Sequence, residues 1–284
     1  MESKSKIYVK NVSSVYQYKL NKYNKLLTIF GEYHNAKLDC GEGKKIISLS
    51  EFIIDTLKYN KNTKVILEYD ASINYKSILE IINSDNIREI IKALDDNKAI
   101  DKIIPVDCRD CYLGVKYHRD LYNNPKMNKG FCYINTHYIN KFLLSRININ
   151  ENVHEDLVCI LKDYLDDLKN IFLYLKNNWD KIEPPVDYIE NIPFNLYLLK
   201  DAWAKVVDYY ILEQLFMNDD TTEYICLMGE AHRVNLQNFL SKAFKITTKH
   251  QVANGNDCIC VNKMMHGSYF VTKIITSGFS DMKF

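Results

Sequence analysis

Short, continuous runs of apolar residues constrain the fold of this chain more than any other feature. Runs that do not alternate with polar residues are typical of strands buried on both faces of a sheet. The runs of this kind are Leu26 to Phe30, Lys64 to Tyr69, Ile103 to Asp107, Tyr224 to Met228 and Cys258 to Val261. Segments that favour further strands, at an edge or near the end of the chain, are Ile7 to Val9, Val15 to Tyr18 and Tyr269 to Ile275.

Between the first three runs, apolar residues recur at helical spacing. One such segment extends from Ile46 to Leu57, with Ser50 as a candidate N-cap, and another surrounds Ile87 to Leu94. Strands that alternate with helices predict a parallel sheet with crossover helices. We therefore expect an α/β fold with a mostly parallel central sheet flanked by helices.

Residues 135–217 have a different character. Long helical stretches, Glu155 to Trp179 and Leu198 to Met217, dominate this part of the chain, and prolines interrupt them. This pattern predicts a helical insertion, or cap, between the third and fourth core strands. Because no flexible linker, repeat or low-complexity segment is visible, we expect residues 1–284 to form a single α/β domain that carries this cap.

The composition restricts the partners of the protein. The net charge is +1, so no strong field attracts nucleic acid or an anionic membrane, and no segment has the apolar length of a membrane span. The chain starts without an apolar segment of signal-peptide length, and its eight cysteines lack framework spacing. We therefore expect a cytoplasmic protein with reduced thiols and no nucleic-acid or membrane partner. The Cys108-x-x-Cys111 pair lacks a second pair at zinc-ligand spacing, so we assign it no metal or redox role.

Two copies of the pattern Gly-Glu-x-His follow two of the predicted core strands. The first motif, Gly31 to His34, follows the run that ends at Phe30, and the second motif, Gly229 to His232, follows the run that ends at Met228. Ligands in open parallel sheets bind beyond the carboxyl ends of the strands, and glycine permits a sharp turn there. Two matching motifs in that position, almost two hundred residues apart, predict one shared active site.

The residue types in the motifs indicate acid–base or metal chemistry. Glu32 and His34, or Glu230 and His232, would project to one side of an extended backbone. A carboxylate beside an imidazole fixes its tautomer and raises its basicity, which suits a general base or a metal ligand. Taken singly, each residue is more often structural: a histidine after a strand is usually satisfied in the core, and a glutamate there often caps a helix.

Ionisable residues also end the second and third predicted strands. Glu68 adds a carboxylate to the predicted site, while Asp107 and Arg109 bring an acid and a fixed cation that could bind substrate. The alternative for Asp107 and Arg109 is a structural ion pair. The candidate metal ligands are His34, Glu68 and His232.

On these motifs the chain resembles the superfamily that joins erythromycin esterases, ChaN-like haem-uptake lipoproteins and the TIKI/TraB proteins. The resemblance covers about residues 26–245 and rests on the two Gly-Glu-x-His motifs, on Glu68 and on Arg109, in that order along the chain. It implies hydrolysis of an ester, amide or related bond in a small molecule or peptide. The branches differ in mechanism: TIKI proteins look like metalloproteases, erythromycin esterases use His and Glu without a metal, and ChaN-like members bind haem.

We therefore expect a hydrolase with Glu32, His34, Glu68, Glu230 and His232 as catalytic residues, with or without Mn, Co or Zn. Arg109 and Asp107 would bind the substrate. The alternatives are a non-catalytic protein that binds haem, a metal or a small ligand, or an inactive structural protein. The abundance of Lys, Asn, Ile and Tyr fits an AT-rich genome, such as that of a large DNA virus, and would place the protein in host cytoplasm or a virion.

Overall fold

The computed structural model describes residues 7–32, 45–82, 84–108, 139–140, 142–144, 147–178, 194–244, 249–252, 259–263 and 269–271. The chain divides into two compact units. The first unit comprises Met1–Leu67, Leu79–Ile104 and Asp220–Phe284, and the second comprises Glu68–Ile78 and Pro105–Asp219.

A mixed central sheet is the largest element of the described structure. Its strand order is β6-β5-β7-β3-β2-β8. The strands are β2 (Ser14–Leu20), β3 (Lys25–Glu32), β5 (Thr63–Asp70), β6 (Ile103–Asp107), β7 (Glu223–Gly229) and β8 (Lys249–Val252). At its centre β7 pairs in parallel with both β3 and β5, whereas β2 pairs antiparallel with β3 and with β8. The α/β class and the parallel core agree with the sequence-based expectation.

A smaller sheet in the first unit has the order β10-β9-β1-β4. Its strands are β1 (Ile7–Val9), β4 (Lys45–Ile47), β9 (Ile259–Lys263) and β10 (Tyr269–Val271). The sequence predicts a strand for the run Cys258 to Val261, and Ile259 in this run begins β9, which pairs antiparallel with β1. A short apolar run shows that a strand is buried, but the run does not identify its partner.

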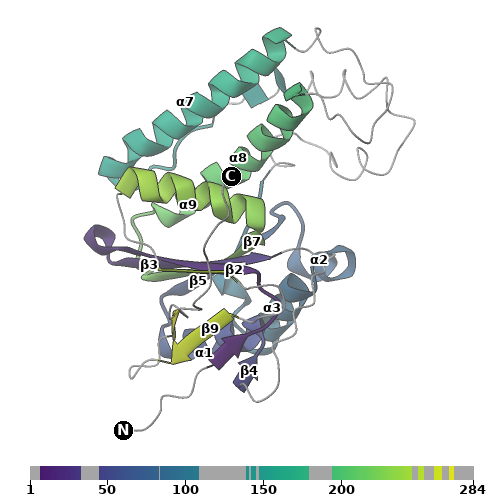
Figure 1. The fold of residues 1–284 in the computed structure, drawn as a ribbon, viewed down its shortest axis with the longest axis vertical. Coiled ribbons are helices and arrows are strands. Elements are labelled where there is room, and N and C mark those ends of the chain that lie inside the picture. Colours follow the sequence, from purple (N-terminus) through teal and green to yellow (C-terminus); the bar gives the residue numbers. More distant parts are fainter. Residues whose placement is uncertain are drawn as a thin grey trace, which may run out of the picture. The chain divides into compact units, whose positions relative to one another are not determined.

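Helices cover both faces of the central sheet in the first unit (Figure 1). The helix α9 (Glu230–Phe244) lies on one face, while α1 (Leu49–Tyr59) and α3 (Asp85–Asp96) lie on the other. The ring of Phe30 on β3 contacts the ring of Phe52 on α1, with centroids 5.4 Å apart. The side chain of Phe30 therefore lies on the face of the sheet that α1 covers. The short helices η1 (Asn21–Tyr23) and η2 (Ile100–Lys102) also belong to this unit, and α2 (Tyr75–Ile81) includes residues of both units.

The helix α1 begins later than its apolar periodicity suggests. Ser48 accepts a hydrogen bond from the backbone N–H of Glu51, and the Glu51 carboxylate accepts from the backbone N–H of Ser48. This capping box defines the helix start, so Ser48 and not Ser50 is the N-cap. Ile46 and Ile47, expected in the helix, form part of β4 instead.

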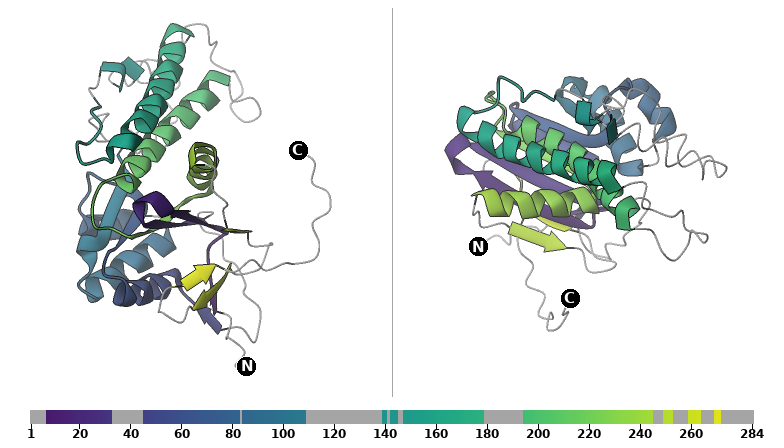
Figure 2. Two further views of the ribbon diagram at one scale, coloured as in Figure 1. Left: turned by 90° about the vertical axis from the view of Figure 1, so that its left-hand side faces the viewer. Right: turned by 90° about the horizontal axis from the view of Figure 1, so that it is seen from above.

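The second unit contains two long helices that lie between β6 and β7 in the chain (Figures 1 and 2). These are α7 (Glu155–Asn178) and α8 (Phe194–Leu215). They pack through an aromatic cluster in which the ring of Phe172 lies 4.2 Å from that of Phe142 and 4.7 Å from that of Trp203, measured between centroids. That residues 135–217 form a cap within a single domain stays a prediction. Among the described residues, none of the helices is long and apolar enough to cross a membrane.

Candidate functional site

The two Gly-Glu-x-His motifs begin on neighbouring parallel strands. Strand β3 ends with Gly31 and Glu32, and strand β7 ends with Gly229. In the pairing of these strands Gly31 lies opposite Met228, and Glu32 lies opposite Gly229. The two motifs therefore leave the sheet side by side, at its carboxyl edge, with a stagger of one residue.

Gly31 leaves space that the second motif fills. A Cβ atom at this position would overlap Oε2 of Glu230, and it would lie 2.5 Å from Oγ of Ser14 and 3.0 Å from Cδ of Arg233. Any residue other than glycine would displace these groups. Close approach of another side chain, rather than an unusual backbone conformation, is thus the reason for glycine at position 31.

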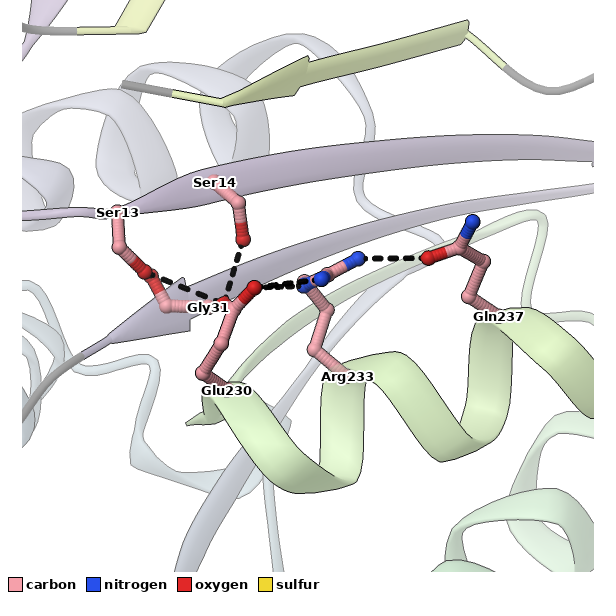
Figure 3. A network of polar contacts seen from close by, with 6 residues as sticks. All are labelled: Ser13, Ser14, Gly31, Glu230, Arg233 and Gln237. Carbon is pink, nitrogen blue, oxygen red and sulfur yellow. Dashed lines mark hydrogen bonds and ion pairs between the residues drawn. The ribbon is translucent and has the colours of Figure 1, made fainter. Parts of the chain in front are cut away.

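The carboxylate of Glu230 is fully occupied by donors from the first unit (Figure 3). Its Oε2 accepts hydrogen bonds from the hydroxyls of Ser14, at 2.7 Å, and Ser13, at 3.2 Å. Its Oε1 accepts from Nε of Arg233 at 2.8 Å and forms an ion pair with Nη2 of the same side chain at 2.5 Å. The single Ser13 proton is shared with the carbonyl oxygen of Gly31, which lies 2.9 Å from the Ser13 hydroxyl, so Glu230 has three full donors and part of a fourth. These donors hold the carboxylate in place, and it is not free to bind a metal ion.

Arg233 is buried and contacts groups on three sides. Only 6% of its side chain is exposed, and its Nη1 donates to Oε1 of Gln237 at 2.8 Å. Its guanidinium carbon lies 4.6 Å from the ring centroid of Tyr16 on β2. Burial raises the pKa of Tyr16 above its ordinary value, although the positive charge of Arg233 opposes this change. Tyr16 is therefore neutral, and Glu230 is the anionic partner of Arg233 in this network.

Glu32 points to the opposite face of the sheet from Glu230. Successive side chains of a strand alternate between faces, so Glu32 shares the side of Phe30 and Phe52, whereas the missing Cβ of Gly31 faces α9. On its side Glu32 is 4% exposed and accepts hydrogen bonds from Oγ of Ser84 at 2.8 Å and from Nδ2 of Asn86 at 3.0 Å. Ser84 is also the N-cap of α3, so Glu32 is bound to the start of that helix.

This geometry corrects two expectations. Glu32 and Glu230 do not face one pocket, because β3 lies between their carboxylates. The pair Glu230 and His232 does not lie on an extended backbone either, because α9 begins at Glu230. Residues two positions apart on a helix are separated by about 200° around its axis, so Glu230 does not support the imidazole of His232 from the same side.

The two histidines differ in what the structure describes. His232 lies in the first turn of α9 and is 6% exposed, which is a protected position for an imidazole. His34 and Arg109 lie outside the described residues, so the expected approach of His34 to His232 stays a prediction. Asp107 ends β6 and is half-buried, and its backbone carbonyl accepts from the N–H of Ala71.

Glu68 stands within strand β5 rather than at its end, because β5 continues to Asp70. Its side chain is half-buried. Among the described residues, no group of three or more His, Cys, Asp or Glu side chains is arranged to hold a metal ion. Cys108 is buried and lies 4.0 Å from the carbonyl oxygen of Val206, while Cys111 falls outside the described residues.

Ser13, Ser14 and Arg233 are absent from the set of residues expected from sequence. Arg233 directly follows the second motif and stands three residues after Glu230, which is the spacing of an ion pair on a helix. This spacing predicts an ion pair only if the helix is known to begin at Glu230. The two serines are more than two hundred residues from Glu230 in sequence, and no local pattern joins them to it.

Comparison of the chain with protein-family models, with curated proteins and with solved structures found no match. The resemblance to the erythromycin esterase, ChaN and TIKI/TraB superfamily therefore rests on the motifs and their strand context alone.

Proposed function

We propose that the protein is a hydrolase of an ester, amide or related bond, with an active site at the carboxyl edge of β3 and β7. The observation that supports this proposal is the pairing of Glu32 with Gly229, from which both motifs leave the sheet side by side. The carboxyl edge of parallel strands is where open α/β sheets bind their ligands. The interlock of Gly31 with Glu230 also gives the two motifs a fixed relation, as one site would require.

In this proposal the histidines carry the proton transfer and the glutamates hold the scaffold. His34 takes a proton from the attacking water, and His232, protected in the first turn of α9, completes the base or binds a divalent ion. The saturated carboxylate of Glu230 fixes the start of α9, and Glu32 fixes the end of β3 against α3. The roles expected from sequence for Glu68, as support for the site, and for Arg109 and Asp107, as residues that bind an anionic substrate group or the developing oxyanion, stay predictions.

The test is an assay of the purified full chain on chromogenic substrates, namely p-nitrophenyl acetate and butyrate and a peptide p-nitroanilide. We expect hydrolysis above the buffer rate that falls about 10²–10⁴-fold in His34→Ala and in His232→Ala. His154→Ala is the matched control, because this histidine lies outside both motifs, and it should retain the wild-type rate. Equal rates in all four proteins would refute the proposal.

Two further treatments distinguish the branches of the proposal. Loss of activity in EDTA, with recovery on addition of Mn, Co or Zn, would assign a metal to the histidines, whereas indifference to EDTA would favour the metal-free esterase mechanism. Titration with haem tests the alternative of a binding protein. A saturable Soret band that disappears in His232→Ala, in a chain that hydrolyses none of the substrates, would replace the hydrolase proposal.

A further inference from the structure

Arg233 carries a buried positive charge beside the two motifs. The proposed hydrolysis assigns no role to this residue. Buried guanidinium groups are retained only where their hydrogen bonds and charge are satisfied. Its Nε and Nη2 both meet Oε1 of Glu230, and its Nη1 meets Oε1 of Gln237. The face of the guanidinium lies over the ring of Tyr16. The edges of the guanidinium therefore donate hydrogen bonds, and one of its faces contacts an aromatic ring.

These contacts attach one turn of α9 to two strands. Glu230 and Arg233 lie on the side of that turn that faces the sheet (Figure 3). The Glu230 carboxylate contacts the hydroxyls of Ser13 and Ser14 and fills the space that Gly31 leaves. Ser14 lies opposite Gly31 in the pairing of β2 with β3, so both strands are joined at the same level. His232 stands between Glu230 and Arg233 in the chain. Its backbone is thus held from both sides.

We propose that Arg233 is a positioning residue, which sets the place of His232 in the active site by clamping Glu230 against β2 and β3. This inference rests on the proposed function and extends it to a residue outside both motifs. The clamp depends on the planar shape of the guanidinium and not only on its charge. An ammonium group cannot meet Glu230, Gln237 and the ring of Tyr16 from one position.

The test is Arg233→Lys in the full chain, which retains the positive charge and removes the planar guanidinium with its several N–H donors. Displacement of a reacting group by about 1 Å costs on the order of 10²-fold in rate. We therefore expect kcat for p-nitrophenyl acetate to fall about 10²-fold while KM changes little. Arg88→Lys is the matched control: Arg88 also pairs three residues back, with Asp85 in the first turn of α3, but Arg88 is only half-buried and Asp85 is exposed. It should retain the wild-type kcat.

A spectroscopic measurement makes the test independent of activity. In histidine-labelled protein, the ring resonance of His232, assigned through its loss in His232→Gln, should shift in Arg233→Lys and stay unchanged in Arg88→Lys. The resonance of His154 should stay in place in both variants. A residue that contributes stability alone would lower the melting temperature without moving the His232 resonance selectively.

The outcomes separate this inference from the proposed function. An unchanged His232 resonance together with unchanged kcat in folded Arg233→Lys would overturn the inference. If the wild-type chain hydrolyses none of the substrates, the proposed function fails, and the resonance still decides whether Arg233 positions His232. If Arg233→Lys does not fold, Ser14→Ala replaces it, because this variant removes a single hydrogen bond from Glu230. It should shift the same resonance by a smaller amount, and no shift would overturn the inference.

Discussion

A Cβ atom on Gly31 would overlap the carboxylate of Glu230, so the first residue of one Gly-Glu-x-His motif makes room for the second residue of the other. The two motifs are therefore complementary in shape. This relation explains why a glycine and a glutamate that are far apart in sequence occur together.

Gly31→Ala should destabilise the fold, because overpacking of a closed site typically costs about 1–3 kcal/mol. The loss should depend on the size of residue 230. In a Glu230→Ala background the carboxylate no longer overlaps the added methyl group, and only the side chains of Ser14 and Arg233 must shift, so Gly31→Ala should then cost less. In a Glu230→Gln background, where the volume is retained, it should cost as much as in the wild-type chain. Urea unfolding of the two double-mutant cycles measures this, and equal costs in both backgrounds would contradict the interlock.

Arg233→Met should cost about 3–5 kcal/mol in the free energy of unfolding, because it leaves the partly buried Glu230 carboxylate without its counter-ion. The double variant Glu230→Gln with Arg233→Met removes that unpaired charge. We expect it to be more stable than Arg233→Met alone. Denaturant unfolding of the wild type, both single variants and the double variant gives the coupling energy, and simple additivity would mean that the ion pair is not coupled.

Ser84→Ala should destabilise the first unit by about 0.5–2 kcal/mol, because it removes the N-cap of α3 and a hydrogen bond to Glu32. Ser84→Asp is the informative companion. Aspartate restores a cap acceptor but places a second carboxylate against Glu32, so it should be less stable than Ser84→Ala. Ser72→Ala, at an exposed position, serves as the control in thermal unfolding. A stabilising effect of Ser84→Asp would contradict the described surroundings of Glu32.

The stability of the chain should carry a pH dependence from Glu223. Burial raises the pKa of Glu223, although hydrogen bonds from Asn60 and Thr63 oppose this change. The folded chain thus binds the proton of the Glu223 carboxyl more tightly than the unfolded chain does. The stabilising contribution of the protonated carboxyl to the free energy of unfolding is therefore complete at low pH, and it is lost as the pH rises through the raised pKa.

Glu223→Gln keeps an acceptor for both donors and cannot ionise. We expect it to be more stable than the wild type at neutral pH, with an advantage that disappears on acidification. Thermal unfolding of both proteins across the acid range measures the difference. The exposed Glu89→Gln is the control and should show no such trend. If the stability advantage of Glu223→Gln instead grew toward low pH, the pKa of Glu223 would be lowered by folding and not raised.

His34→Ala and His232→Ala should not be additive if both histidines serve one water molecule. Once either is removed, most of the rate advantage is gone, so the double variant should be little slower than the slower single variant. Steady-state rates on p-nitrophenyl acetate measure this. Multiplying losses would instead assign the two histidines to separate tasks, such as base and substrate binding.

The sequence alone predicted the α/β class and the parallel core, because both follow from local properties. A continuous apolar run such as Leu26 to Phe30 indicates a strand buried on both faces, wherever that strand pairs. The intervening helical periodicity requires crossover connections. Motifs that directly follow such strands must lie near the edge of the sheet, so the neighbourhood of Gly31 and Gly229 was also predictable.

Only the tertiary structure decided how the two motifs meet. Alternation along β3 predicts that Gly31 and Glu32 face opposite sides, but which helix covers each side depends on packing between distant segments. The serines that bind Glu230 come from β2, far from it in sequence, and their contact arises from strand pairing. The start of α9 at Glu230, which brings Arg233 beside it, likewise depends on contacts with β2 and β3 that no local pattern contains.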